Sequence, residues 1–376
     1  MPFRSRGRFR PPSRSGALPS YDFSTLTAGA ASLPAGLVLT RASANGSVQI
    51  GTSQVATGIA ADVARAGRRL DADPIGLVIE EARTNLVTQA RSMAAGSGWA
   101  VGTASTATAN ATPSPDGSTN AWRQVSTAAQ YGNYFTRNAS DGLVQVSEWG
   151  RATSAPFTCR TQIGAGVDIA LTLAWQRFVA SHTAAGLYFI TPQNASGSAP
   201  TQDGLWDLFQ IEVGAFATEW TPQSSTRAAD RLVCTLPVAN AGRLSLDVTL
   251  QPKGARSVYA ADPYLVYLDA SNYVQLLTAT GYIKCAVGGV TYTTPIGVTF
   301  AAYDTVKLRV EVGANASTLV TSQVNSDPTV LLSTGTPTAL GNWPVGNVDL
   351  FGNAGSNVLS AWVRALSFDT NQGEWV

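Results

Sequence analysis

The chain has 376 residues, of which 25 are basic and 24 are acidic, so its formal net charge is +1. Only 13% of the residues are charged, which argues against nucleic acid as a partner for the whole body of the protein. The length is that of about two domains. No stretch approaches the roughly 18 consecutive apolar residues that a membrane-spanning helix needs, so we expect no membrane insertion.

Histidine and cysteine are scarce, which limits the chemistry of the chain. The single histidine, His182, argues against zinc sites built from several histidines, and we expect it to lie in a solvated turn. The three cysteines are widely spaced and lack a CxxC motif, so we interpret them as buried apolar residues: Cys159, Cys234 and Cys285. We predict no metal site and no cofactor.

Residues 1–20 form a basic arm with no acidic residue and with five arginines: Arg4, Arg6, Arg8, Arg10 and Arg14. Without these five, 20 basic residues face 24 acidic ones, so the rest of the chain carries a net charge of −4. The arm has too few apolar side chains to fold alone. We predict that it becomes ordered against an acidic surface of a larger assembly. The alternative is a disordered tip without a role.

The pattern of the remaining sequence predicts an all-β fold. Thr, Ser, Ala, Val and Gly dominate, and several segments alternate between apolar and polar residues, among them 208–213, 244–250 and 306–312. Turn signals such as Gly288-Gly289 separate these segments. We expect 59–69 to be helical or irregular. Many short strands with no helical pattern between them favour β-sandwiches.

Three stretches resemble one family, the virion adhesion proteins of bacteriophages and gene transfer agents. The sequence GLVIEEARTNL at 76–86 looks like the family's GLLIE-x-ARTNL signature. The segment LAWQRF at 173–178 looks like the T-x-W-Q-R strand of jelly-roll carbohydrate-binding modules, and QIEVGAFATEWTP at 210–222 is similar to the ending of these modules. Residues 231–376 resemble a concanavalin A-like or laminin-G-like sandwich.

The resemblance implies two jelly-roll or β-sandwich domains in tandem, preceded by the extended basic arm. We expect four parts: the arm at 1–20, an irregular connector at 21–90 packed on the first sandwich, a carbohydrate-binding-module-like jelly roll at 91–225, and a concanavalin A-like or laminin-G-like sandwich at 226–376.

The function implied by the resemblance is that of a non-enzymatic virion structural protein, a head spike, a head or tail fibre, or a decoration. The arm would anchor it to capsid or tail proteins of a particle assembled in the host cytoplasm. The sandwiches would bind host surface polysaccharide, with a homotrimer favoured by family likeness. The alternatives are a purely structural connector without a ligand and a glycan depolymerase. A depolymerase needs two carboxyl groups, and Glu148 with Glu212 is the pair that could share a groove.

Sugar binding needs aromatic faces and planar polar side chains. We expect most tryptophans to lie in the core and place the glycan-binding candidates in turn-like segments, where side chains are exposed. These candidates are Tyr131, Asn133, Tyr134, Trp206 with the adjacent Asp207, and Trp343. A group of three tyrosines, Tyr264, Tyr267 and Tyr273, is a further candidate.

Overall fold

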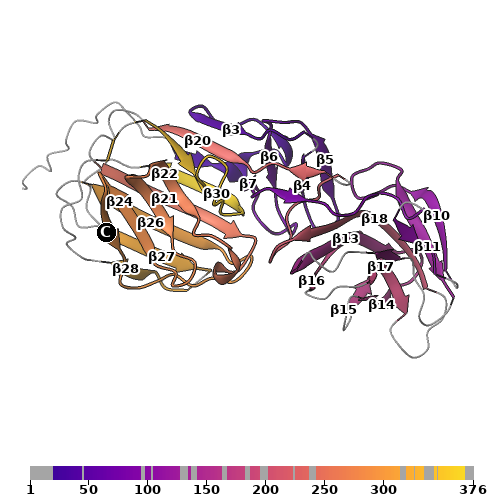
Figure 1. Ribbon diagram of the computed structural model, residues 1–376. Helices are drawn as coiled ribbons and strands as arrows, with labels where there is room; N and C mark the ends of the chain where they lie inside the picture. Colours follow the sequence, from indigo (N-terminus) through magenta and orange to yellow (C-terminus); the bar gives the residue numbers. More distant parts are fainter. Residues whose placement is uncertain are drawn as a thin grey trace, which may run out of the picture.

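The computed structural model describes residues 20–368, apart from 45, 95–97, 103–104, 128–133, 137–141, 163–166, 183–186, 195–201, 223–224, 237–242, 314–318, 326, 334–342 and 345. The described residues form strands, turns and short 3-10 segments and contain no α-helix, so the all-β prediction is confirmed. Two β-sandwiches lie side by side, with N-terminal strands along one edge of their junction (Figure 1). In the described residues, we find no helix with the length and apolarity needed to cross a membrane.

The jelly roll consists of two five-stranded antiparallel sheets. The first has the order β10 (Ser105–Thr112), β11 (Ala121–Ser126), β18 (Gln202–Val213), β13 (Val144–Ala152) and β16 (Gln176–His182). The second has the order β15 (Val167–Leu171), β14 (Phe157–Gln162), β17 (Leu187–Asn194), β12 (Tyr134–Thr136) and β9 (Trp99–Ala100). Alternate residues of both sheets fill the core between them, which includes Trp99, Trp149 and Phe209.

The second sandwich is larger. Its nine-stranded sheet has the order β2 (Gly29–Ala31), β6 (Ala64–Gly67), β7 (Gly76–Ile79), β30 (Ala361–Phe368), β21 (Arg243–Pro252), β26 (Val306–Gly313), β27 (Leu319–Val324) and β28 (Val330–Ser333), and β1 (Ser20–Asp22) also pairs with β30. Its seven-stranded sheet has the order β25 (Val290–Thr293), β24 (Ile283–Val287), β23 (Asn272–Leu276), β22 (Tyr264–Asp269), β29 (Gly346–Leu350), β20 (Arg231–Leu236) and β3 (Leu37–Thr40).

The strands of residues 20–79 complete the sheets of the second sandwich. We expected an irregular connector packed on the first sandwich, but β7 pairs with β30 and β3 pairs with β20. The jelly roll is therefore inserted between two parts of one sandwich, and its entry and exit are joined by a short ladder of β8 (Arg83–Thr84) and β19 (Thr226–Arg227). The N-terminal segment also contacts the jelly roll, since Val55 belongs to the jelly-roll core.

Two local expectations are wrong. Residues 59–69, expected to be helical or irregular, include the end of β5 (Val55–Ile59), which pairs with β4 (Gly46–Gln49), and all of β6. His182 ends β16 opposite Val144 and is only 7% exposed, because the strand continues through the segment that looked like a turn. The expectation for the three cysteines is confirmed, since all three are buried and free.

Candidate functional site

Both tryptophans predicted to contact ligand are buried, so the expectation that they are exposed in turns is wrong. Trp206 lies in the middle of β18 and has no exposed surface, and Trp343 is equally buried in the core of the second sandwich. Trp206 packs over Gly150 of the neighbouring β13, where a Cβ atom would lie 2.5 Å from the indole ring. The glycine opposite the tryptophan is the sequence signal that could have indicated burial.

Asp207 is also buried rather than exposed. Its carboxylate accepts hydrogen bonds from Arg91, with Arg91 Nη2 at 2.5 Å from Oδ2. Arg91 pairs in turn with Asp116 at 2.7 Å. Asp207 therefore belongs to a structural ion-pair group that holds the segment after the 76–86 motif against the jelly roll.

The other predicted residues fall into two groups. Tyr131, Asn133 and the five arginines of the arm lie outside the described residues, and so does the side chain of Tyr134, whose backbone is in β12. The three tyrosines of β22 and β23 do come together. The ring centroid of Tyr264 lies 4.8 Å from that of Tyr267 and 5.4 Å from that of Tyr273, with the rings edge to face.

Glu148 and Glu212, the acid pair considered for a depolymerase, lie on opposite faces of one sheet. Glu212 is opposite Gln145 and accepts hydrogen bonds from the backbone N–H and hydroxyl of Thr218 at 2.6 and 2.7 Å. Glu148 is three residues beyond Gln145 on β13, and it lines a small cavity that opens between β16 and β15. The two carboxyl groups cannot act on one bond. Among the described residues, no three His, Cys, Asp or Glu side chains are grouped to hold a metal ion.

A buried network of charges centred on Glu80 joins the two sandwiches. Glu80 directly follows β7, and its Oε2 accepts from Arg65 at 2.8 Å and from Arg227 at 2.5 Å. Its Oε1 accepts from Lys253 at 2.6 Å and from the backbone N–H of Glu219 at 2.7 Å. All four donors come from different parts of the chain, and Glu219 belongs to the segment that closes the jelly roll.

The two sequence motifs that resemble virion proteins and carbohydrate-binding modules meet in this network. Burial by itself would raise the pKa of Glu80, but Arg227, Lys253 and Arg65 outweigh burial and hold that pKa well below its usual range. Asn85 also joins the 76–86 motif to the jelly roll. Its side-chain amide donates to the carbonyls of Phe209 and Thr221 at 3.0 and 2.8 Å. The polar residues of the 76–86 motif therefore hold the junction together.

A cavity of about 340 Å³ lies at the same junction, which we call the junction cavity. Side chains from the N-terminal segment, from β16, from the segment after β18 and from the second sandwich line it. They are Gln49, Thr52, Arg69, Leu70, Gln176, Arg177, Val179, Ala217, Tyr303 and Trp362. Its volume is at the lower end of the range of about 300–1,000 Å³ found for small-ligand sites. Clefts between domains are a preferred place for such sites.

Tyr303 is held in a strained backbone conformation at this cavity. Its φ of 68° is in the left-handed region, which is rare for a bulky residue and costs on the order of 1 kcal/mol or more. Two hydrogen bonds hold it there: its N–H donates to the carbonyl of Pro252, and its own carbonyl accepts from Gln251, both at 2.8 Å. Burial raises the pKa of the Tyr303 hydroxyl, so the phenol is neutral at physiological pH.

Three buried polar atoms on side chains that line the junction cavity have no hydrogen-bond partner among the described residues. They are Nε of Arg69, Oε1 of Gln176 and Nε1 of Trp362. Buried polar atoms are nearly always paired, because leaving one unpaired costs about 1–3 kcal/mol. Because these three atoms have almost no exposed surface, they lie behind the wall of the cavity, and a ligand would meet the exposed parts of the Arg69 and Gln176 side chains instead.

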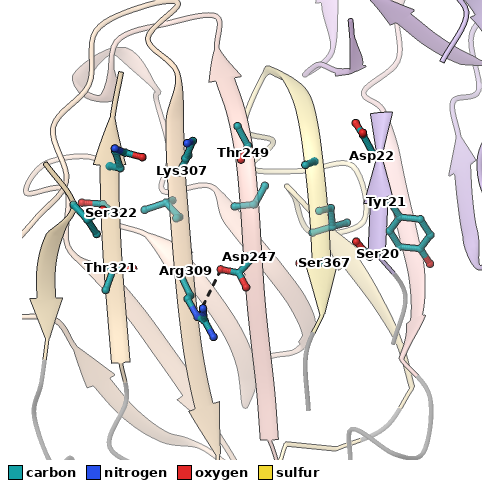
Figure 2. Close-up of a pocket in the computed structure, with 16 residues that line it drawn as sticks. Ser20, Tyr21, Asp22, Asp247, Thr249, Lys307, Arg309, Thr321, Ser322 and Ser367 are labelled. Carbon is teal, nitrogen blue, oxygen red and sulfur yellow. Dashed lines mark ion pairs between the residues drawn. The ribbon is translucent and has the colours of Figure 1, made fainter. Parts of the chain in front are cut away.

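A larger but shallower hollow of about 550 Å³ lies across the outer faces of β1, β30, β21, β26 and β27, and we call it the outer groove (Figure 2). One of its two cations is already paired, since Arg309 lies 3.7 Å from Asp247 and 3.1 Å from Glu311. The one aromatic residue that lines it, Tyr21, is only 5% exposed. The outer groove therefore lacks a ring on which a sugar could stack.

The likeness of this chain to known proteins is distant and concerns solved structures. No protein-family model matches the chain, and no curated protein matches it. Among solved structures, the chain is similar to the N-terminal tandem of two CBM22 domains from Xyn10C of Paenibacillus barcinonensis. The similarity has a TM-score of 0.26 and 10% sequence identity, and it covers 77% of this chain and 99% of that one.

Proposed function

We propose that the protein is a non-enzymatic glycan-binding protein and that a saccharide binds in the junction cavity. The observation that carries this proposal is that one cavity is lined by the side chain of Tyr303, by the amide of Gln176 and by the guanidinium of Arg69, which has no carboxylate partner among the described residues. A tyrosine side chain contacts the apolar face of a pyranose, and guanidinium and amide groups bind its hydroxyl groups. A single cavity of this size gives modest affinity, which several copies on one particle would raise.

The proposal predicts that Tyr303→Ala weakens binding to a polysaccharide that the intact chain binds. We expect a loss of roughly tenfold, because removing a stacked ring costs on the order of 1 kcal/mol or more. Gln176→Ala should also weaken binding, and it tests the cavity without removing a ring from the core. The measurement is titration calorimetry of the full chain after a screen on a polysaccharide array.

Tyr267→Ala separates the two aromatic candidates, because it removes a tyrosine of the β22–β23 group: it should leave the affinity unchanged if the saccharide binds in the junction cavity, and loss of binding in this variant alone would place the site on β22 and β23. Equal affinity of the Tyr303→Ala variant and the parent chain would contradict the assignment of the cavity. If the parent chain binds no polysaccharide at all, the purely structural alternative is favoured. Clearing of a polysaccharide solution by the parent chain would instead favour a depolymerase.

We further propose that the protein acts on a virion, where the basic arm anchors it to capsid or tail proteins and the sandwiches reach host polysaccharide. The support is the resemblance of 76–86 to virion adhesion proteins and the five arginines of the arm. A trimeric assembly belongs to the same proposal. We expect that deletion of residues 2–16 abolishes incorporation into particles and leaves the thermal unfolding of the purified protein unchanged. Normal incorporation of the shortened chain, measured by immunoblotting of purified particles, would overturn the anchoring role.

A further inference from the structure

The side chains that line the junction cavity carry positive charge and no negative charge. Arg69 and Arg177 contribute two guanidinium groups, and none of the other lining residues is acidic. The acidic residues close by already have partners. Asp73 accepts from the backbone N–H of Leu70 at 3.1 Å, and Glu212 accepts from Thr218. Glu219 accepts from Lys253 at 2.6 Å and from the backbone N–H of Gln49 at 2.7 Å. Asp71 accepts from the backbone N–H of Thr52 at 3.2 Å.

Arg69 differs from the other arginines of the junction because no carboxylate pairs with it among the described residues. Arg65 and Arg227 each form an ion pair with Glu80, and Arg177 lies 4.0 Å from Glu219. The guanidinium carbon of Arg69 lies 4.6 Å from the centroid of the Tyr303 ring, so the ring supports the cation from one face. The in-plane N–H groups of a stacked guanidinium remain available to an acceptor, and its Nε is among the unpaired buried atoms.

Trp362 lies behind Tyr303, with its ring centroid 6.0 Å from that of the tyrosine. Its side chain is 2% exposed, and the ammonium of Lys253 lies 4.1 Å from the centroid of its ring. The indole is covered by the cation and almost fully buried, so Trp362 forms part of the cavity wall, whereas the half-buried Tyr303 keeps surface that a ligand can contact. The two arginines of the lining favour a ligand with an acceptor that carries negative charge.

We infer that the junction cavity is selective for acidic saccharides, whose carboxylate, sulfate or phosphate group pairs with Arg69 while the sugar ring contacts Tyr303. This inference rests on the proposed glycan-binding function and specifies the class of ligand. The Arg69 guanidinium can form two parallel hydrogen bonds to an oxyanion, which a neutral hydroxyl group cannot accept in the same way. The half-buried Gln176 side chain lines the same cavity, where an amide hydrogen-bonds a neighbouring sugar hydroxyl.

The test compares pairs of polysaccharides that differ only in charge. The probes are polygalacturonate with its carboxyl-reduced counterpart, and dextran sulfate with dextran. We expect the full chain to bind at least one charged polymer roughly tenfold or more tightly than its neutral counterpart, since a charge-assisted pair contributes about 1.5–3 kcal/mol. Arg69→Gln should remove this preference. Lys307→Gln, which removes an exposed cation from the outer groove, should preserve it and so excludes a nonspecific effect of net charge.

Each other outcome overturns a defined part of the inference. If charged and neutral polymers bind equally well, the selectivity for acidic saccharides is wrong and the proposed glycan binding stands. If the charge preference persists in the Arg69→Gln variant, the acidic group is bound elsewhere. If Arg69→Gln and Lys307→Gln reduce the preference equally, the attraction is a general surface effect. If no polymer binds, both the proposed glycan binding and the proposed selectivity are wrong.

Discussion

Replacement of Glu80 by glutamine is expected to destabilise the protein by about 3–5 kcal/mol. The Glu80 carboxylate accepts from three cations and one backbone N–H, and a glutamine in its place would present an NH₂ group to some of these donors. Breaking a buried ion pair by removing one partner leaves uncompensated buried charge, which accounts for the size of the effect. Because the network connects both sandwiches, we expect their unfolding to separate into two transitions. Differential scanning calorimetry of the variant measures both effects.

Asp203→Asn provides the control for this experiment. Asp203 pairs with Arg123 at 2.5 Å, but the arginine side chain is 47% exposed, and exposed pairs typically contribute at most about 1 kcal/mol. A Glu80→Gln variant that loses no more stability than the Asp203→Asn variant would contradict the central role of the network. One cooperative transition in the Glu80→Gln variant would show that other contacts suffice to couple the sandwiches.

Replacement of Glu148 by glutamine is expected to stabilise the protein at neutral pH. Burial raises the pKa of Glu148 well above its usual range, and neither carboxylate oxygen has a hydrogen-bond partner among the described residues. The folded state therefore keeps Glu148 protonated while the unfolded state releases the proton. Titration of Glu148 therefore costs the parent chain no free energy of unfolding below the ordinary glutamate pKa of about 4.3. Above that pH, the free energy of unfolding falls as pH rises toward the folded-state pKa.

The advantage of the Glu148→Gln variant should therefore be small at pH 4. It should grow by about 1.4 kcal/mol for each pH unit between the two pKa values. Chemical denaturation of both proteins at several pH values measures the difference. Asp203→Asn should act in the opposite direction, because hydrogen bonds from Arg123 lower the pKa of Asp203. A stability difference between Glu148→Gln and the parent chain that does not change with pH would contradict this account.

Local patterns in the sequence predicted most of the strands correctly. The alternating segments 244–250 and 306–312 lie within β21 and β26, where apolar residues face the core. Gly288 and Gly289 both adopt positive φ and join β24 to β25, as the two-residue turn signal predicted. These features depend on neighbouring residues only, so a single sequence contains them.

Pairings between distant segments were not predictable in the same way. Nothing in residues 76–79 indicates that their partner strand begins at residue 361. The same limitation explains the error at Trp206 and Asp207. Gly-Leu-Trp-Asp looks like a turn locally, but it lies within a twelve-residue strand whose neighbours bury both side chains. The junction cavity combines residues from 49 to 362, and only its spatial arrangement distinguishes Arg69 from the other arginines.

The insertion of the jelly roll into the second sandwich has a mechanical consequence. The chain crosses between the sandwiches twice, and both crossings run through the paired strands β8 and β19. A pulling force on the jelly roll is therefore divided between two covalent connections instead of passing through a single linker. The Glu80 ion pairs lie beside these crossings. They therefore resist bending of the jelly roll against the second sandwich, while the backbone carries the tension.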